Sequence, residues 1–397
     1  MNNNFYSDAQ LIFLIEARRQ GLSWSEVAEK FNKKFGVDKS YDTLRMAYNK
    51  YRNSFDMGDE KIRVKELQSM VSTRLKSAQI AKENKEILLS LESKQGLLEQ
   101  IEALVDNLNK TKVKFKKVKL DSKKKRMTLE LMLSDLHYGK KTDTFDLAIA
   151  RQRMQDLCAT FIKEIHRSQK LYNVDRIILA LLGDLIESST MHGIESAKGC
   201  EFGNSRQVAE AINSIYLDMI LPVATEAAKL GIVIDIPAVT GNHDRTEKDR
   251  TMHNPGEDNL TYIIYKSLQL ICEQKGFKHV RFHIPKGPYQ ELDIYGNTAL
   301  YEHFDNSAAN TRAALMKLLS DRQTQIKKIV DFFRGGHYHE STVYGRGKII
   351  VNGSLPGPDS YSMVKGFESH SDQMINYYVE TTERPNCYYR SFPVYLK

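Results

Sequence analysis

The feature that most constrains this chain is a set of short apolar runs that end in metal-binding residue types. The stretch VIDIPAVTGNHDR, residues 233–245, reads as a strand up to Val239 and then presents an amide, an imidazole and a carboxylate side by side. Asn, Asp and Gly are ordinary turn formers, so one such ending carries little information. Four more apolar runs end in the same way, and this repetition indicates a shared site.

These runs begin near residue 129 and alternate with amphipathic helical segments, which is typical of a layered α/β domain. The polar residues that follow the runs are, in chain order, Asp135, His137, Asp184, Asn242, His243, Asp244, His303, His337 and His339. Strands that end at one edge of a sheet place such residues together. In extended chain, residues i and i+2 point the same way, so Asp-x-His and His-x-His can each reach one ion. Glycines before several of these residues let the backbone turn sharply and approach closely.

The chemistry of the set predicts a reactive metal site. Carboxylate, imidazole and amide groups without a thiolate favour manganese, iron or zinc in such a site over a structural zinc ion. Two ions about 3.5–4 Å apart can generate hydroxide at neutral pH and neutralise the charge of a phosphorane-like transition state. We expect two divalent ions, with manganese favoured and iron or zinc as alternatives.

The motif series resembles the calcineurin-like metallophosphoesterases over roughly residues 128–355. The matching motifs are Asp135-x-His137, Gly183-Asp184, Gly241-Asn242-His243-Asp244, His303 and Gly336-His337-x-His339. The resemblance implies an α/β fold in which two facing β-sheets are flanked by helices and a two-metal site lies at the strand ends.

The resemblance also implies a role for each matching residue. One metal would be held by Asp135, His137, Asp184 and His339, and the other by Asp184 as a bridge with Asn242, His303 and His337. His243 would protonate the leaving oxygen, and Asp244 would orient it. In the family, the histidine that corresponds to His303 is usually followed by Gly, whereas this chain has Phe304.

Residues 1–55 predict a small three-helix domain. Ser7-x-x-Gln10 and Ser23-x-x-Glu26 are capping boxes that begin the first two helices. A third helix around residues 40–52 is expected to bury Leu44 and to carry basic residues outward. The unit resembles helix-turn-helix DNA-binding domains of a Myb-like or phage type, whose last helix enters the major groove. A protein-docking module is the alternative.

Residues 56–126 predict a helical spacer that ends in a basic segment. Leucine and isoleucine at positions 97, 101, 104 and 108 keep a 4-3-4 spacing, which favours a short coiled coil and a homodimer. A plain spacer helix is the alternative. The segment KTKVKFKKVKLDSKKKR, residues 110–126, is expected to be a mobile basic strap that binds phosphates without sequence preference, or else a solvated linker.

Net charge is unevenly distributed over the 397 residues. Residues 1–55 hold 9 Lys and Arg against 6 Asp and Glu, residues 56–126 hold 18 against 11, and residues 127–397 hold 31 against 33. All of the excess positive charge therefore lies in the first third, which indicates a basic arm that meets a polyanion and a near-neutral catalytic domain at 127–397.

The remaining composition favours a cytoplasmic protein without membrane contact. The N-terminus MNNNFYSDAQ lacks a signal-peptide pattern, and no run reaches the ~18 apolar residues of a membrane span. The 4 cysteines are scattered without CxxC pairs, which suits a reducing compartment.

The substrate class is left open by the catalytic motifs alone. The basic first third favours DNA, and the whole arrangement resembles phage-encoded phosphoesterases with a site similar to that of double-strand-break repair exonucleases. Our first hypothesis is a DNA-directed phosphodiesterase. One alternative is a phosphomonoesterase or nucleotide hydrolase whose N-terminal part only localises it. Another is a DNA-binding structural protein with an idle site, against which the intact ligand set counts.

Overall fold

The computed structural model describes residues 6–51, 114–116, 118, 120–188, 199–245, 256, 258–358, 370–382 and 386–397. The chain divides into two compact units, Met1–Leu91 and Glu92–Lys397. Each unit is described by itself. The predicted coiled-coil residues 60–109 lie outside the described residues, so the coiled coil stays a prediction, as do the domain boundaries at 55 and 126.

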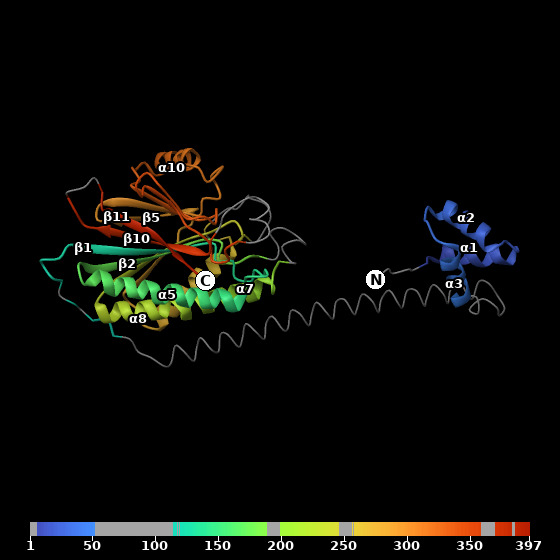
Figure 1. The fold of residues 1–397 in the computed structure, drawn as a ribbon, viewed down its shortest axis with the longest axis horizontal. Helices are drawn as coiled ribbons and strands as arrows, with labels where there is room; N and C mark the ends of the chain where they lie inside the picture. The colour runs from blue at the N-terminus through green and yellow to red at the C-terminus, as the bar shows by residue number, and fades with distance from the viewer. Residues whose placement is uncertain are drawn as a thin grey trace. The chain divides into compact units, whose positions relative to one another are not determined.

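The N-terminal unit contains the three predicted helices, α1 (Asp8–Arg19), α2 (Trp24–Phe35) and α3 (Tyr41–Tyr51) (Figure 1). Both predicted capping boxes are present, at Ser7 and at Ser23. The helices pack around a small apolar core that includes Leu14, Val27, Phe31 and Leu44. The arginine and lysine of α3 are exposed, as the sequence predicts, while its role in DNA binding stays a prediction.

The second unit is built on two β-sheets. The larger sheet has the strand order β11-β10-β1-β2-β3-β4, and the smaller has the order β5-β6-β7-β9-β8. The strands of the larger sheet are β1 (Arg126–Leu133), β2 (Asn173–Leu182), β3 (Val233–Val239), β4 (Val280–His283), β10 (Asp372–Val379) and β11 (Tyr388–Tyr395). Those of the smaller sheet are β5 (Tyr289–Ile294), β6 (Asn297–Glu302), β7 (Phe332–Gly335), β8 (Thr342–Tyr344) and β9 (Ile349–Val351).

Strand direction decides where the functional residues meet. Strands β1 to β4 are parallel to one another in the larger sheet, and β6, β7 and β9 are parallel in the smaller one. The carboxyl ends of these central strands therefore gather at one edge of each sheet.

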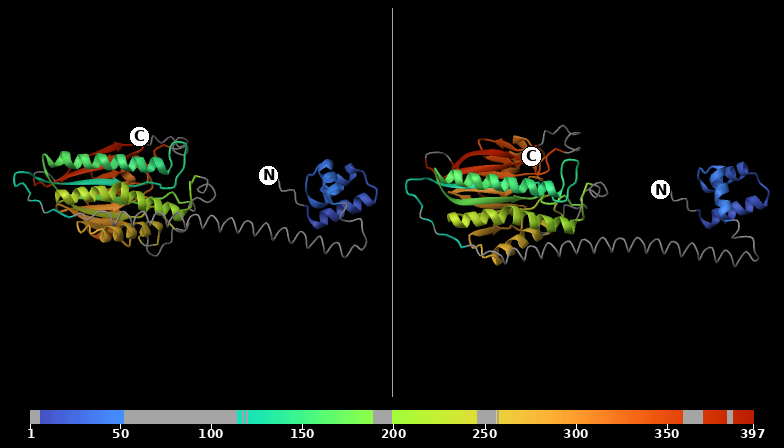
Figure 2. Two further views of the ribbon diagram at one scale, coloured as in Figure 1. Left: turned by 90° about the horizontal axis from the view of Figure 1, so that it is seen from below. Right: turned by 60° about the horizontal axis from the view of Figure 1, so that its bottom comes forward.

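Helices cover the outer face of each sheet. The larger sheet is covered by α5 (Leu147–Gln169), α7 (Asn204–Ser214), the π-helix η2 (Ile215–Ile220), α8 (Leu221–Leu230) and α9 (Leu260–Gln274). The smaller sheet packs against α10 (Arg312–Ile326). Figure 1 shows α10 on one side of the stacked sheets and α5 and α8 on the other, and Figure 2 shows α5 and α8 running side by side along the strands.

A separate apolar core lies between the two sheets. Met132, Ile178 and Leu182 from the larger sheet pack with Tyr301 and Phe332 from the smaller one. Because both faces of the central strands are covered, β1 is buried over seven of its eight residues, which explains its continuous apolar run. The prediction of two facing sheets flanked by helices is confirmed.

Within the part of the chain that the structure describes, one helical run is long and apolar enough to cross a membrane by length and composition. It spans Asn204–Leu230, and 67% of its most apolar window is buried inside the protein. It comprises α7, η2 and α8, which pack against the larger sheet. A core helix of a globular domain has the same composition, and burial on this scale indicates that role.

The described part of the basic strap, residues 114–116, 118 and 120–126, is docked on the body, contrary to the expectation that it is mobile. The backbone N–H of Lys116 donates to the carbonyl oxygen of Ala228 over 2.8 Å, at the end of α8. The Phe115 ring lies 5.2 Å from the His279 ring, next to the start of β4. Main-chain pairing and ring packing hold these residues where the sequence shows only lysines and scattered apolar residues.

A second set of contacts holds the strap just before β1. The Asn173 amide exchanges hydrogen bonds with the backbone of Asp121, at 3.0 and 2.7 Å, and donates to the carbonyl oxygen of Lys124 over 2.8 Å. The strap therefore runs past the amino ends of β2, β3 and β4. Since β2 has 10 residues and a strand rises about 3.3 Å per residue, the strap lies roughly 30 Å from the carboxyl ends.

Replacing Asn173 with alanine should release the strap. The change removes three hydrogen bonds, each contributing about 1 kcal/mol, so the free energy of unfolding should fall by about 1–3 kcal/mol. Thermal unfolding measures this loss, and limited trypsin digestion should cleave faster after Lys123–Lys125. An unchanged digestion rate at those lysines would show that Asn173 does not hold the strap.

Candidate metal centre

All seven predicted metal ligands lie just past the carboxyl ends of strands. Asp135, Asp184 and Asn242 follow β1, β2 and β3 of the larger sheet, whereas His303 follows β6 of the smaller one. His337 and His339 follow β7. The two sheets thus contribute ligands from facing edges, as expected from the parallel strand directions.

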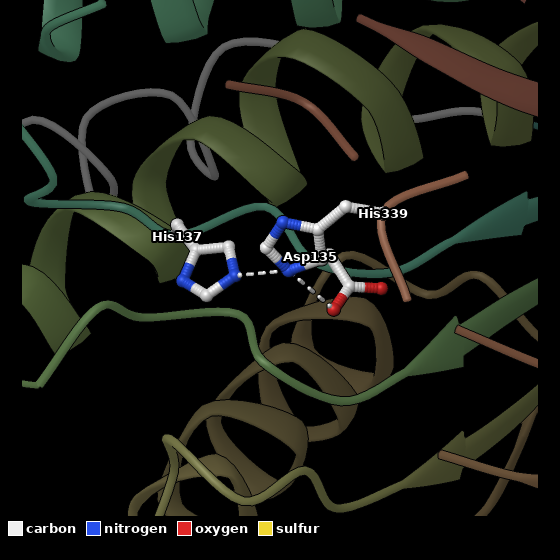
Figure 3. Close-up of side chains that lie close together, drawn as sticks. All are labelled: Asp135, His137 and His339. Atoms are coloured by element: carbon white, nitrogen blue, oxygen red, sulfur yellow. Dashed lines mark hydrogen bonds and ion pairs between the residues drawn. The ribbon is translucent and has the colours of Figure 1, made fainter. Parts of the chain in front are cut away.

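One cluster combines Asp135, His137 and His339, whose ligand atoms all lie within 4.8 Å of one another (Figure 3). Nε2 of His137 lies 3.2 Å from Nε2 of His339, which in turn lies 3.3 Å from Oδ1 of Asp135. Two imidazole nitrogens that face each other beside a carboxylate are the donor set that a divalent ion prefers among nitrogen and oxygen ligands.

A second cluster combines Asp184, His303 and His337, again within 4.8 Å, and a third group of this kind joins His137 with Glu187 and His243. Nε2 of His303 lies 3.0 Å from Oδ2 of Asp184, and the other Asp184 oxygen accepts the backbone N–H of His243 over 2.7 Å. Oδ1 of Asn242 is buried and has no hydrogen-bond partner among the described residues. A buried amide oxygen is unfavourable without a partner, so its presence here fits a metal ligand.

Most of the predicted ligands lie on strained backbone. Among the described residues, ten non-glycine residues have positive φ, and five of them are predicted ligands: Asp135 (52°), His137 (48°), Asp184 (50°), His337 (76°) and His339 (57°). Left-handed backbone costs an L-residue roughly 1–2 kcal/mol. Such strain clusters at functional sites, where the surrounding structure imposes it.

The glycines beside the ligands permit close packing, as the sequence indicates. A Cβ atom on Gly241 would lie 2.1 Å from Oδ1 of Asp184, and one on Gly336 would lie 2.3 Å from Oδ2 of Asp135. Both positions therefore exclude any side chain, because no real Cβ contact is that short.

Phe304, which stands where the sequence resemblance leads us to expect Gly, adopts a φ of 79°. Its ring is fully buried and lies 4.5 Å from the Phe333 ring beneath α10. The ring occupies the space in front of Gly335, where an added Cβ would lie 2.5 Å from it. Ring burial and a glycine on the next strand thus compensate for the missing glycine, and His303 keeps its predicted place.

Asp244 makes contacts that the sequence does not indicate. Its carboxylate accepts the backbone N–H groups of Gly241, Asp184, Leu185 and Ile186, at 2.7 to 3.4 Å. The side chain therefore braces the loops after β2 and β3, and the orienting role that the resemblance implies for it stays a prediction. The imidazole of His243 contacts the carbonyl oxygen of Glu187, 2.8 Å from Nδ1.

Glu187 is the site residue that sequence reasoning missed. Its Oε2 lies 2.7 Å from Nδ1 of His137, whose Nε2 faces the first cluster. A carboxylate behind a metal-binding imidazole fixes the ring and raises its basicity. The only sequence feature that points to Glu187 is its position three residues after Asp184. Sequence alone does not distinguish a loop glutamate that contacts a histidine from one that is exposed to solvent.

Charges within the site favour metal binding by the imidazoles. Burial lowers the pKa of His137 to about 4, and burial together with the charge of His303 lowers the pKa of His337 to about 4. Both rings are therefore neutral at pH 7. Burial opposes ionisation of Asp135, but its hydrogen bond with His339 lowers its pKa to about 2.

His243 differs from the neutral imidazoles. Burial opposes its charged form, but the carboxylates of Asp184 and Glu187 raise the pKa of His243 above its ordinary value. Its ring is perpendicular to that of His137, with centroids 4.8 Å apart. The pKa of His303 is raised as well, because the charge and hydrogen bond of Asp184 outweigh its burial. The site therefore combines two neutral imidazoles, those of His137 and His337, with two that favour a proton, and its donor set fits divalent metal ions.

Comparisons with known proteins give a likeness of fold. No family model and no curated protein matches the sequence. Among solved structures, the chain is similar to a predicted phosphoesterase from Streptococcus pneumoniae TIGR4, at 11% identity and a TM-score of 0.27, over 68% of this chain and 98% of the other.

Two further structures are similar at the same level. Vps29 from Entamoeba histolytica, complexed with zinc, has 11% identity and a TM-score of 0.26, over 67% of this chain and 98% of that one. An archaeal phosphodiesterase has 13% identity and a TM-score of 0.29, over 67% and 99%. At these values the likeness carries no conclusion about activity, which has to be judged from the site.

Glu187→Gln should weaken metal binding through His137. Loss of a carboxylate behind a ligand typically lowers metal affinity about 10–100-fold. Isothermal titration of the purified protein with Mn²⁺ measures the change. Glu164→Gln is a matched control, because Glu164 is also buried but contacts Tyr377 away from the site. Equal metal affinity in the Glu187 and Glu164 variants would contradict the role of Glu187.

Proposed function

We propose that the protein is a two-metal phosphoesterase that acts on DNA as a phosphodiesterase. The observation that carries this proposal is the convergence of two metal-type clusters beside His243, whose ring lies 4.8 Å from that of His137 and which is not one of the predicted ligands. A structural metal site would not need an acid at its edge, whereas hydrolysis of an ester with a poor leaving group does.

The residues fit two ions. One ion would be held by Asp135, His137 and His339, and the other by Asn242, His303 and His337, with Asp184 shared. When bound, such a pair supplies a hydroxide nucleophile at neutral pH and neutralises charge in the transition state. Manganese is the metal that we propose, with iron and zinc as alternatives.

The other chemical roles belong to side chains of this chain. Nδ1 of His243 faces the Glu187 carbonyl oxygen and donates to it, so Nε2 is the nitrogen that gives its proton to the leaving oxygen. Asp244 holds the loop that carries His243, and Glu187 orients the His137 ring. General acid catalysis of this kind typically contributes about 10²–10⁴-fold to the rate.

DNA as the substrate is supported by the first third of the chain. It carries all of the net positive charge and a three-helix unit with exposed basic residues on α3. A phosphomonoesterase or nucleotide hydrolase is the second candidate, because the catalytic body has a near-neutral balance of 31 basic and 33 acidic residues.

Parallel assays on four substrates test the function. Plasmid DNA, a single-stranded oligonucleotide, bis-p-nitrophenyl phosphate and p-nitrophenyl phosphate are incubated with the Mn²⁺-loaded protein, with chelator, and with the Asp184→Asn variant. We expect hydrolysis of DNA and of the diester that chelation and the substitution both abolish. Preference for the monoester would favour the second candidate, and full activity in excess chelator would exclude a two-metal mechanism.

A shortened chain beginning at Lys114 tests the contribution of the N-terminal part. This boundary keeps the docked strap, so the body retains its contacts at Ala228 and Asn173. Diester hydrolysis should be nearly unchanged, while binding to long DNA weakens, and the difference should shrink at high salt because phosphate contacts are screened. Equal DNA binding by both chains would assign the N-terminal part to another partner.

His243→Ala should separate acid catalysis from metal binding. A sugar oxygen of DNA needs a proton to leave, so DNA hydrolysis should fall about 10²–10⁴-fold. Nitrophenolate leaves readily without one, so the nitrophenyl diester should be affected much less, and metal content should be unchanged. Loss of metal, or equal slowing of both substrates, would contradict the acid role.

A further inference from the structure

An ion pair joins the two loops that bear ligands of the second cluster. Nη2 of Arg245 lies 2.5 Å from Oδ2 of Asp305. Arg245 comes three residues after Asn242 and directly follows the braced Asp244, whereas Asp305 comes two residues after His303. The pair therefore connects the β3 loop of the larger sheet with the β6 loop of the smaller one.

The chain places Asp305 beside the metal-type cluster, because only the buried Phe304 separates it from His303. The second oxygen of Asp305 accepts from the side chain of Asn306 over 3.2 Å. Because both of its oxygens accept hydrogen bonds, the carboxylate is held in place and in turn orients the guanidinium of Arg245.

The exposure of this pair differs from that of a purely structural one. The side chains of Arg245 and Asp305 are 14% and 13% exposed, whereas Arg334 and Glu130, between the two sheets, are both 0% exposed. A guanidinium has five N–H donors in a planar fork, and the contact with Asp305 uses one of them. The group is held in orientation while its edge remains at the protein surface.

We propose that Arg245, oriented by Asp305, binds the non-bridging oxygens of the substrate phosphate on the side of the second cluster. The inference rests on the proposed function and names a specificity residue for it. Arginine suits the task because its fork matches two phosphate oxygens, which a lysine does not.

Binding of inorganic phosphate tests the inference independently of turnover. The Mn²⁺-loaded full chain is titrated with phosphate by calorimetry, and Arg245→Gln should weaken the affinity about 10–100-fold, as expected for a charge-assisted hydrogen bond. Arg245→Lys should restore part of the loss, and Asp305→Asn should give an intermediate value. Metal content and circular dichroism should match those of the unaltered protein.

Arg176→Gln is the matched control. Arg176 forms a similar pair with Asp235, at 2.6 Å and with 20% and 1% exposure, on strands away from the ligand loops. This variant should keep its phosphate affinity. A phosphate affinity within twofold for Arg245→Gln, or a loss of affinity that follows a loss of metal, would overturn the inference. Absence of ester hydrolysis by the unaltered protein would instead count against the proposed function.

Kinetics give a second readout if hydrolysis is observed. Arg245→Gln should raise KM for bis-p-nitrophenyl phosphate with a smaller change in kcat, because the residue contacts groups that do not react. A fall in kcat at constant KM would assign Arg245 to transition-state stabilisation by way of the metals and would overturn its role in substrate binding.

Discussion

The site depends on one buried carboxylate. Asp244 accepts four backbone N–H groups from two separate loops, and these loops carry Asp184, Asn242 and His243. Burial and the nearby charge of Asp184 raise the pKa of Asp244 to about 7. The N–H groups oppose this rise, because their hydrogen bonds stabilise the ionised carboxylate. The arrangement holds because the donors are main-chain groups with few other partners at a strand end.

The strained ligands and the packed cores belong together. Positive φ at Asp135, His137 and Asp184 is held by backbone bonds between the β1 and β2 loops, such as His137 N–H to the Asp184 carbonyl oxygen at 3.1 Å. At Phe304 the same geometry is held by an aromatic ring in the core beneath α10. Backbone hydrogen bonds in one place and ring packing in the other therefore impose the same positive φ. The placement of the predicted ligands thus relies on both sheets remaining in register.

Sequence predicts the strand ends well because buried runs and ligand types are both local signals. The two sheets and the capping boxes lie where the pattern places them, and six of the predicted ligands come together in two clusters. The contacts of Asp244 with main-chain groups could not be predicted. In the sequence, an aspartate that accepts main-chain N–H groups looks the same as one that orients the neighbouring imidazole. Glu187, the compensation between Phe304 and Gly335, and the docked strap depend on contacts between distant residues, which no local pattern encodes.

The strap contacts have a consequence for how such a chain can change over evolutionary time. Because the described residues of the strap join the body at the amino ends of the strands, this point of attachment lies away from the rim formed by the carboxyl ends. A change of chain length at the attachment point therefore alters the polypeptide far from the predicted ligands.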